Sequence, residues 1–508
     1  MKKIFLLLLL MPLYLVNGQD SLLVQYSTGI SQAELTEHVK TLASQEFEGR
    51  GTGDAGQKLA SQYIKEQFIQ MKLEGPSPHG DPYFQEFTLI KGGLQSLELI
   101  INQDTLSTNS NLAIMGSIPS CDTVYDLVFV GYGIDNKIYS DYENIDVSGK
   151  IVAFIAGEPK DKNGKYLISG SYLPEYIDRG KKKATIALAK GAVASIRINP
   201  DHDQVDKMIQ MLKKFSGGSQ LKFPDNTPDN NKISGLIHMG INDASTVFNI
   251  KPNEFEKALV KLSKGKNQSG AFISKVKLLT SQLDATVETE NIVAFLPGTD
   301  LSDEYVIITA HFDHLGKRDE NIYFGADDNA TGTAAVIEIA EAFSELAKAG
   351  IRPKRSILFM PVTGEERGLL GSRYYVKNPL FSLDKTIATI NMDMIGRSDD
   401  EHVDNPDYVY VYISDTVDSE LAHTAHTAAL CVQDELSPEY RYVSDNDFRM
   451  GGSDHASFEK ANIPVLYFFC GIHQDYHRPT DTWDKVEYKK LTAITRMVFV
   501  SAWQIANK

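Results

Sequence analysis

The sequence has few cysteines and, after its first residues, no long apolar segment. Its 508 residues include only three cysteines, Cys121, Cys431 and Cys470. A fold cross-linked by many disulfides is therefore excluded. Because the number of cysteines is odd, at least one thiol is free in a monomer. Cys431 and Cys470 could pair, or Cys470 could be a buried free thiol, and the sequence leaves both possibilities open. No apolar run after Val16 is long enough for a membrane-spanning helix.

The chain also has fewer basic residues than acidic ones. The chain has 51 lysines and arginines against 67 aspartates and glutamates, a net charge of −16 at pH 7. Nucleic acids bind basic surfaces because every phosphate is negative, so this balance argues against nucleic acid as a partner. Hydrophobic residues at 42% and charged residues at 23% are ordinary for a soluble globular protein, and the length predicts more than one domain.

The first residues have the pattern of a secretory signal. Lys2 and Lys3 precede the apolar run from Ile4 to Val16, which is too short to span a bilayer. We expect a signal peptide over residues 1–18, cleaved near Gly18, and hence a secreted or periplasmic protein. No cysteine lies at the cleavage point, so a lipid-linked membrane anchor is not expected. The oligomeric state is left unknown.

Apolar runs in the second half of the chain stop at acidic residues or histidines. Two runs, residues 305–310 and 356–363, have the composition of buried strands, and a third precedes position 393. The polar residues after the three runs are His311 and Asp313, Glu365 and Glu366, and Asp393. This pattern predicts an α/β fold with a mixed, largely parallel sheet flanked by helices, whose strands present polar groups at their carboxyl ends.

Asp327 and Asp328 lie just ahead of a segment with helical apolar spacing that ends near Gly350. Negative charge is favoured at that end of a helix. Carboxylates and imidazoles that converge at one sheet edge need charge neutralisation, which a divalent cation supplies. A further metal ligand is expected from the segment that contains His473 and His477, two histidines that compete for this place.

Six short motifs follow one another along the chain. They are AHFDHLG, GADDNATG, GEERGLLGS, NMDMIG, GGSDHASF and DYHRPTDT. In this order they resemble the M28 family of zinc peptidases, which are co-catalytic di-zinc exopeptidases and mostly aminopeptidases. The resemblance covers about residues 31–115 and 285–508. It implies two zinc ions per chain, held by His311, Asp328, Glu366, Asp393 and His477.

The same resemblance assigns roles to individual side chains. Asp328 matches the aspartate that bridges both ions, and Glu365 matches the general base that acts with a metal-bridging hydroxide. Asp313 matches the carboxylate that orients the first histidine ligand. Tyr476 stands where some members have a tyrosine that contacts the reacting carbonyl oxygen. His477 rather than His473 matches the ligand, because Pro-Thr-Asp-Thr follows it closely.

We therefore expect a di-zinc exopeptidase that removes amino-terminal residues from peptides with a free amino terminus. Manganese or cobalt could replace zinc in so carboxylate-rich a site. Alternatives are a glutaminyl-peptide cyclotransferase that works with one zinc, a non-catalytic receptor-like relative, and a carboxypeptidase-like enzyme. For the last, Arg367, Arg397 or Arg449 could bind a terminal carboxylate.

Between residues 117 and 274 the sequence has short apolar strands separated by polar loops, in place of apolar runs that stop at acidic residues or histidines. Gly131-Tyr132-Gly133 and residues 148–152 resemble a protease-associated domain, a small β-rich insert. We expect it to cover the cleft or sort substrates, or else to be a spacer. The predicted organisation has four parts. They are a signal peptide over 1–18, the amino-terminal part of the peptidase domain over 19–116, the insert over 117–274, and the catalytic domain over 275–508.

Overall fold

The computed structural model describes residues 18–108, 110–115, 118, 120–176, 180–200, 205–208, 220–224, 236–318, 320–417, 419–432, 434–442 and 452–508. The expected signal peptide falls almost entirely outside this set, as does Arg449. Within it, no helix is both long enough and apolar enough to cross a membrane. All three cysteines lie among these residues, and none of them forms a disulfide.

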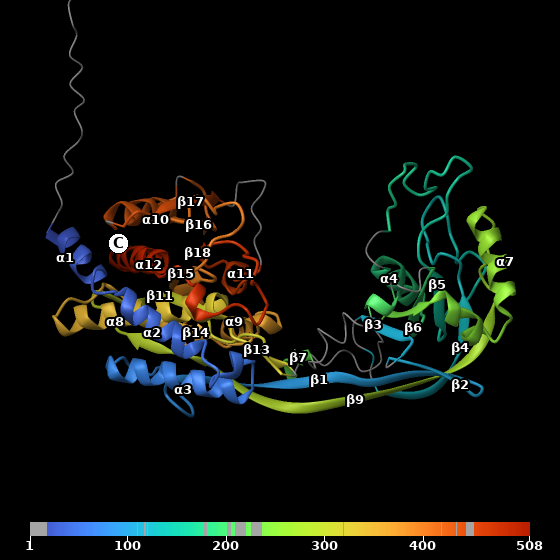
Figure 1. Cartoon of the computed structure of the whole chain (residues 1–508), viewed down its shortest axis with the longest axis horizontal. Helices are drawn as coiled ribbons and strands as arrows, with labels where there is room; N and C mark the ends of the chain where they lie inside the picture. The colour runs from blue at the N-terminus through green and yellow to red at the C-terminus, as the bar shows by residue number, and fades with distance from the viewer. Residues whose placement is uncertain are drawn as a thin grey trace, which may run out of the picture. The chain divides into compact units, whose positions relative to one another are not determined.

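The chain divides into two compact units, residues 1–88 with 288–508, and residues 89–287. The second unit is longer than the insert expected over 117–274. The difference arises from two long strands, β1 (Phe84–Ile101) and β9 (Ile273–Ile292), which carry the chain across the boundary (Figure 1). A strand that runs through a boundary has no turn residues to mark it. The domain limits expected from the sequence stay a prediction. That this unit is a protease-associated domain stays a prediction.

The first unit is built on a mixed sheet, which among the described residues has the order β10-β14-β11-β15-β18-β16-β17. The strands are β10 (Ala294–Leu296), β11 (Leu301–His311), β14 (Arg355–Val362), β15 (Thr386–Met392), β16 (Tyr408–Ile413), β17 (Ser437–Tyr442) and β18 (Val465–Phe469). β14, β11, β15 and β18 are parallel to one another, whereas β10 and β16 are antiparallel to their neighbours β14 and β18. The predicted mixed, largely parallel sheet is confirmed. A separate small hairpin joins β12 (Gly316–Arg318) to β13 (Asn321–Tyr323).

Helices cover both faces of this sheet (Figure 1). Val306 and Ile308 of β11 lie in one core, and Ile307 lies in another core together with Tyr375 and Phe458. Alternate residues of a strand point to opposite faces, which explains why this strand is apolar without interruption. The helices of the first core include α2 (Gln32–Leu42), α3 (Ala55–Gln70), α8 (Gly332–Lys348), α10 (Glu420–Cys431) and α12 (Tyr488–Asn507), and those of the second are α9 (Leu370–Lys377) and α11 (His455–Lys460). α1 (Gly18–Ser27) packs against α8 and α12.

Strand register brings the polar ends of three strands together. His311, the last residue of β11, pairs with Val362, the last residue of β14. Thr309 pairs with Asn391, next to the end of β15. Because these strands are parallel, His311, the turn after Val362 and the residue after Met392 all lie at one edge of the sheet.

The second unit contains a sheet that, among the described residues, runs β2-β1-β9-β4-β5-β6-β8-β3, with β7 paired to β1. Its shorter strands are β2 (Asp104–Ser107), β3 (Leu112–Met115), β4 (Cys121–Phe129), β5 (Ile151–Ile155), β6 (Ala194–Asn199), β7 (Gln220–Lys222) and β8 (Leu236–Gly240). The described helices are α4 (Lys181–Ala189), α6 (Ala244–Phe248) and α7 (Pro252–Ser263). Phe129, Phe248 and Phe255 pack against one another in its core.

Candidate metal centre

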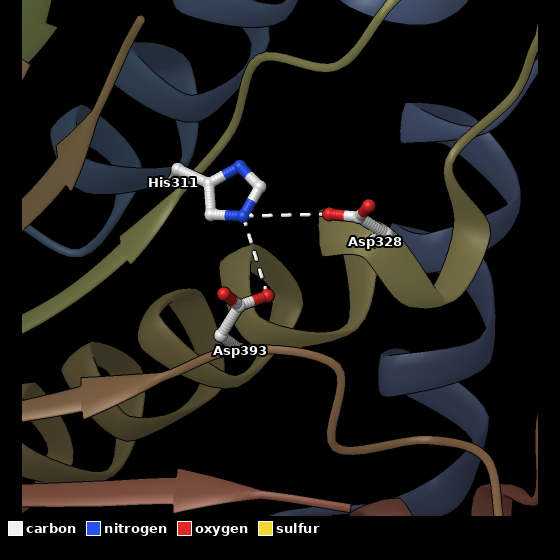
Figure 2. A group of neighbouring side chains, drawn as sticks. All are labelled: His311, Asp328 and Asp393. Carbon is white, nitrogen blue, oxygen red and sulfur yellow. Dashed lines mark hydrogen bonds and ion pairs between the residues drawn. The ribbon is translucent and has the colours of Figure 1, made fainter. Parts of the chain in front are cut away.

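One group of three side chains gathers at the carboxyl edge of the sheet (Figure 2). His311 ends β11, Asp393 follows β15, and Asp328 lies in the helical turn Ala326–Thr331 that leads into α8. Nε2 of His311 is 3.5 Å from Oδ1 of Asp328 and 3.3 Å from Oδ1 of Asp393. All three are buried, so a cation between them would be largely shielded from solvent.

A second group forms around the other carboxylate oxygen of Asp328. Nε2 of His477 is 3.2 Å from Oδ2 of Asp328 and 3.1 Å from Oε2 of Glu366. Nδ1 of His314 is 2.7 Å from Oε1 of Glu366 and 3.6 Å from Oδ2 of Asp328. Asp328 therefore presents one oxygen to each group. His314 was not among the residues selected from the sequence, although it lies in the same AHFDHLG motif as His311.

The two competing histidines of the last motif take different partners. Nε2 of His473 lies 3.2 Å from Oδ2 of Asp327. His477 is the one that reaches Asp328 and Glu366. The ring of Tyr476 stacks on the ring of His477, with centroids 3.8 Å apart, which places the tyrosine beside the second group.

Asp313 holds His311 by a different atom from the one expected. Nδ1 of His311 donates a hydrogen bond of 3.0 Å to the backbone carbonyl oxygen of Asp313, whereas the nearest carboxylate oxygen is 3.9 Å away. The carboxylate instead accepts hydrogen bonds from Thr52 Oγ1 at 2.7 Å and from the backbone N–H of Glu365 at 3.2 Å. The carboxylate is thus occupied by two other donors, and the expectation that it orients the histidine stays a prediction.

The pKa values of the neighbours Glu365 and Glu366 are shifted in opposite directions. Burial raises the pKa of Glu365 well above its usual range, and the nearby charges of Asp393 and Asp454 add to the rise. Burial also acts to raise the pKa of Glu366, but His314 and His477 lower it well below its usual range. Adjacent residues with such different acidities suit different tasks, one exchanging a proton and the other staying ionised.

Arg50 organises the site from a distant part of the chain. Its side chain is 0% exposed and donates hydrogen bonds to the carbonyl oxygens of Phe312 at 2.7 Å, Phe324 at 2.8 Å and Gly325 at 2.8 Å, and also to that of Leu42. Burial lowers the pKa of Arg50 to about 10, while Asp328 and Asp313 act to raise it. The sequence showed only a break between two helices at this point.

Asp481 supports the central aspartate. Its carboxylate accepts the backbone N–H groups of Asp327, at 3.1 Å, and Asp328, at 3.2 Å. Asp475 in turn holds the loop that carries His477, accepting hydrogen bonds from Thr480 at 2.6 Å and Lys485 at 3.0 Å. These contacts hold the main chain at Asp327 and Asp328 and the loop that carries His477.

The GGSDHASF turn also borders the site. Burial raises the pKa of Asp454 to about 7, and His311 acts to lower it. The ring of His455 stacks on Tyr467 with centroids 4.0 Å apart, and burial lowers its pKa to about 4. His455 is therefore a neutral packing residue at pH 7, and it does not belong to either donor group.

The donor set fits zinc or a similar cation. Among the residues that the structure describes, the groups in which three such donors come within reach of one ion are His311, Asp328 and Asp393, and His314, Asp328 and Glu366. Burial acts to lower the pKa of His311, but Asp393, Glu365 and Asp328 together raise it well above its usual range. The site thus attracts positive charge strongly, and imidazole with carboxylate ligands is a combination that zinc accepts.

Comparison with known proteins gives a consistent result. Residues 291–502 match the model of "Peptidase family M28". Leupeptin-inactivating enzyme 1 of Streptomyces exfoliatus is 33% identical over 42% of this chain and 43% of its own length. A probable leucine aminopeptidase of Trichophyton verrucosum is 30% identical over 42% of this chain and 57% of its own length. The chain thus spans about half the length of these curated relatives.

Solved structures agree in fold over nearly the whole chain. An aminopeptidase from Aneurinibacillus sp. strain AM-1 has a TM-score of 0.57 at 20% identity, and the match covers 96% of each chain. A zinc aminopeptidase from Bacillus subtilis has a TM-score of 0.51 at 20% identity and covers 94% of this chain and 96% of its own. These likenesses show the fold of the chain. Residues 291–502, in which the six motifs lie, are similar to peptidase family M28.

Proposed function

We propose that this protein is an aminopeptidase that works with two zinc ions. The observation that carries the proposal is the position of Asp328, whose two carboxylate oxygens face different donor groups. His311 and Asp393 would hold one ion, and Glu366 and His477 the other. Zinc at these places would polarise the peptide carbonyl and lower the pKa of a bound water from 15.7 toward roughly 7.

Glu365 is the side chain suited to move the proton. Its raised pKa, caused first by burial, brings its acidity closer to that needed for exchange near neutral pH. Glu365 would take a proton from the attacking water and pass it to the nitrogen of the leaving amine. Its backbone N–H donates to the Asp313 carboxylate, which holds the main chain in place at this residue.

The charge of the site favours attack at a free amino terminus. When they are ionised, the acids of the site outnumber the positive charges of two zinc ions, and they are Asp313, Asp328, Glu365, Glu366, Asp393 and Asp454. Arg50 offsets one of these negative charges. A surplus of negative charge attracts the ammonium group of a peptide and repels its terminal carboxylate.

A carboxypeptidase would need an arginine that is available to the substrate. Arg397 lies 3.2 Å from the carboxylate of Asp475 and is engaged there, and Arg449 falls outside the described residues. Arg367 follows Glu366 directly, and its buried Nε has no hydrogen-bond partner in the described part of the chain. Arg367 is therefore the side chain that this alternative would use.

One peptide in three forms tests the direction of attack. The forms are the free peptide, the amino-terminally acetylated peptide and the carboxyl-terminally amidated peptide, and products are identified by mass spectrometry. We expect acetylation to abolish cleavage and amidation to change it little, with Glu365→Gln as the inactive control. Cleavage that survives acetylation but not amidation would identify a carboxypeptidase. Cyclisation of an amino-terminal glutamine without hydrolysis would identify a cyclotransferase.

We also propose that the protein is exported and cleaved near Gly18, on the basis of Lys2, Lys3 and the apolar run that follows. Amino-terminal sequencing of the protein recovered from its native cells and medium tests this. A chain that still begins at Met1 in the cytoplasm would contradict it.

A further inference from the structure

His314 is placed in the site by the backbone that surrounds it. It lies three residues after His311, beyond the end of β11, and its backbone N–H donates to the carbonyl oxygen of Arg50 at 3.2 Å. Gly325 packs directly against its ring, since a Cβ on that glycine would lie 2.4 Å from Cγ of His314. The side chain is 0% exposed, so its ring has a defined place in the interior.

The contact between His314 and Glu366 is short but is not a hydrogen bond. Nδ1 of His314 and Oε1 of Glu366 are 2.7 Å apart. Among the residues that the structure describes, neither nitrogen of the His314 ring has a hydrogen-bond partner, and neither does Oε1 of Glu366. Two buried polar atoms this close, neither with a hydrogen-bond partner, are placed as two ligands of one cation would be.

The distances around that point suit a single ion. Two atoms that each bind zinc at about 2.0–2.2 Å can be at most about 4.4 Å apart, and about 3.4 Å in a regular tetrahedron. Nδ1 of His314 is 2.7 Å from Glu366 and 3.6 Å from Asp328, and Nε2 of His477 is 3.1 Å and 3.2 Å from the same two carboxylates. The rings of His314 and His477 meet edge to face, with centroids 5.8 Å apart, so both can approach without overlap.

We propose that Nδ1 of His314 binds the second ion, together with Asp328, Glu366 and His477. This inference rests on the proposed two-ion site and adds a sixth side chain to the five expected ligands. The second ion would then have four protein donors, whereas the first would have three, namely His311, Asp328 and Asp393. Since an ion with fewer protein ligands keeps room for other molecules, the first ion is the one left more open to water and substrate.

Nuclear magnetic resonance of the whole protein can count the bound imidazoles. The protein is labelled with ¹⁵N in its histidines and loaded with ¹¹³Cd in place of zinc, because a one-bond splitting of a ring nitrogen requires a direct metal–nitrogen bond. We expect three split ring nitrogens, one of which disappears in His314→Ala. His423→Ala, at an exposed position on α10, should remove none of the three. Splitting of only two nitrogens, both present in His314→Ala, would overturn the inference.

Zinc affinity gives a second and independent measurement. We expect His314→Ala to raise the dissociation constant of one ion by at least about 100-fold, the upper end of the range for groups that only orient a ligand, while the other ion is unaffected. Competition with a chelator measures both constants, and thermal unfolding of the metal-free forms checks that the variant folds. Unchanged affinity for both ions would overturn the inference. Failure of the wild-type protein to bind two ions would instead overturn the proposed function, so the two failures are distinguishable.

Discussion

Nδ1 of His311 lies 3.0 Å from the backbone carbonyl oxygen of Asp313 and 3.9 Å from its carboxylate. The main chain therefore fixes the tautomer of this histidine, and the carboxylate is left to hold Thr52 and the N–H of Glu365. A substitution of the side chain leaves the contact to the histidine in place.

Asp313→Asn should consequently affect catalysis more than metal binding. A carboxylate that orients a ligand histidine typically contributes 10–100-fold to metal affinity, and we expect a change of less than about tenfold here. Chelator competition and steady-state kinetics measure the two effects, with His311→Ala as the variant that does lose metal. Loss of metal from Asp313→Asn as severe as from His311→Ala would show that the carboxylate is the orienting group.

Glu365→Gln should retain both ions, and its turnover rate should fall by a factor of about 10²–10⁴, the usual range for a general acid–base group. Glu366→Gln is the matched neighbour, and it should lose metal because its carboxylate contacts His477 and His314. Metal analysis of both variants separates these roles. Equal metal loss from the two variants would contradict the assignment.

Asp328→Asn and His477→Ala should differ in how many ions they affect. Asp328 has an oxygen in each donor group, so its substitution should weaken both sites, whereas His477 contacts only the second group. Titration with zinc, followed by elemental analysis, gives the number of ions retained. Retention of one tight ion in Asp328→Asn would argue against a shared carboxylate.

Arg50→Lys should destabilise the first unit although it keeps the charge. A lysine cannot donate to four separated carbonyl groups, and hydrogen bonds from a charged donor contribute about 1.5–3 kcal/mol each. We expect the free energy of unfolding to fall by about 3 kcal/mol or more, measured by chemical denaturation of the metal-free protein. Arg352→Lys, at an exposed position, serves as the control and should leave stability nearly unchanged.

Asp475→Asn should lower stability in a way that depends on pH. Burial acts to raise the pKa of Asp475, but Thr480, Lys485 and Arg397 lower it from 3.8 to about 2. A carboxylate with a lowered pKa in the folded protein stabilises it above about pH 4, and this contribution disappears as the pH falls toward 2. The unfolding midpoints of wild type and variant, measured without metal, should therefore differ at pH 6 and converge near pH 2. A constant difference over this range would exclude the ionised form as the cause.

Local patterns in the sequence determined the elements that build the site. Residues 305–310 are apolar without interruption because β11 is covered on both faces, and the polar residues after it mark the carboxyl edge of the sheet. The order of the motifs identified Asp328 and four further side chains, which the structure does bring together around it, namely His311, Glu366, Asp393 and His477. Strand ends and motif residues are encoded by neighbours in the chain, so they can be read from it.

Tertiary structure alone decided the contacts between distant segments. Arg50 meets the carbonyl oxygen of Phe312 across 262 positions of sequence, and no local pattern encodes such a partner. The inclusion of His314 depends on how the chain turns after β11. Whether Cys431 and Cys470 form a disulfide was left open by the sequence, and the structure shows that they do not. These outcomes follow from the three-dimensional path of the backbone, which sets the direction of each side chain only once the sheet and its helices have packed.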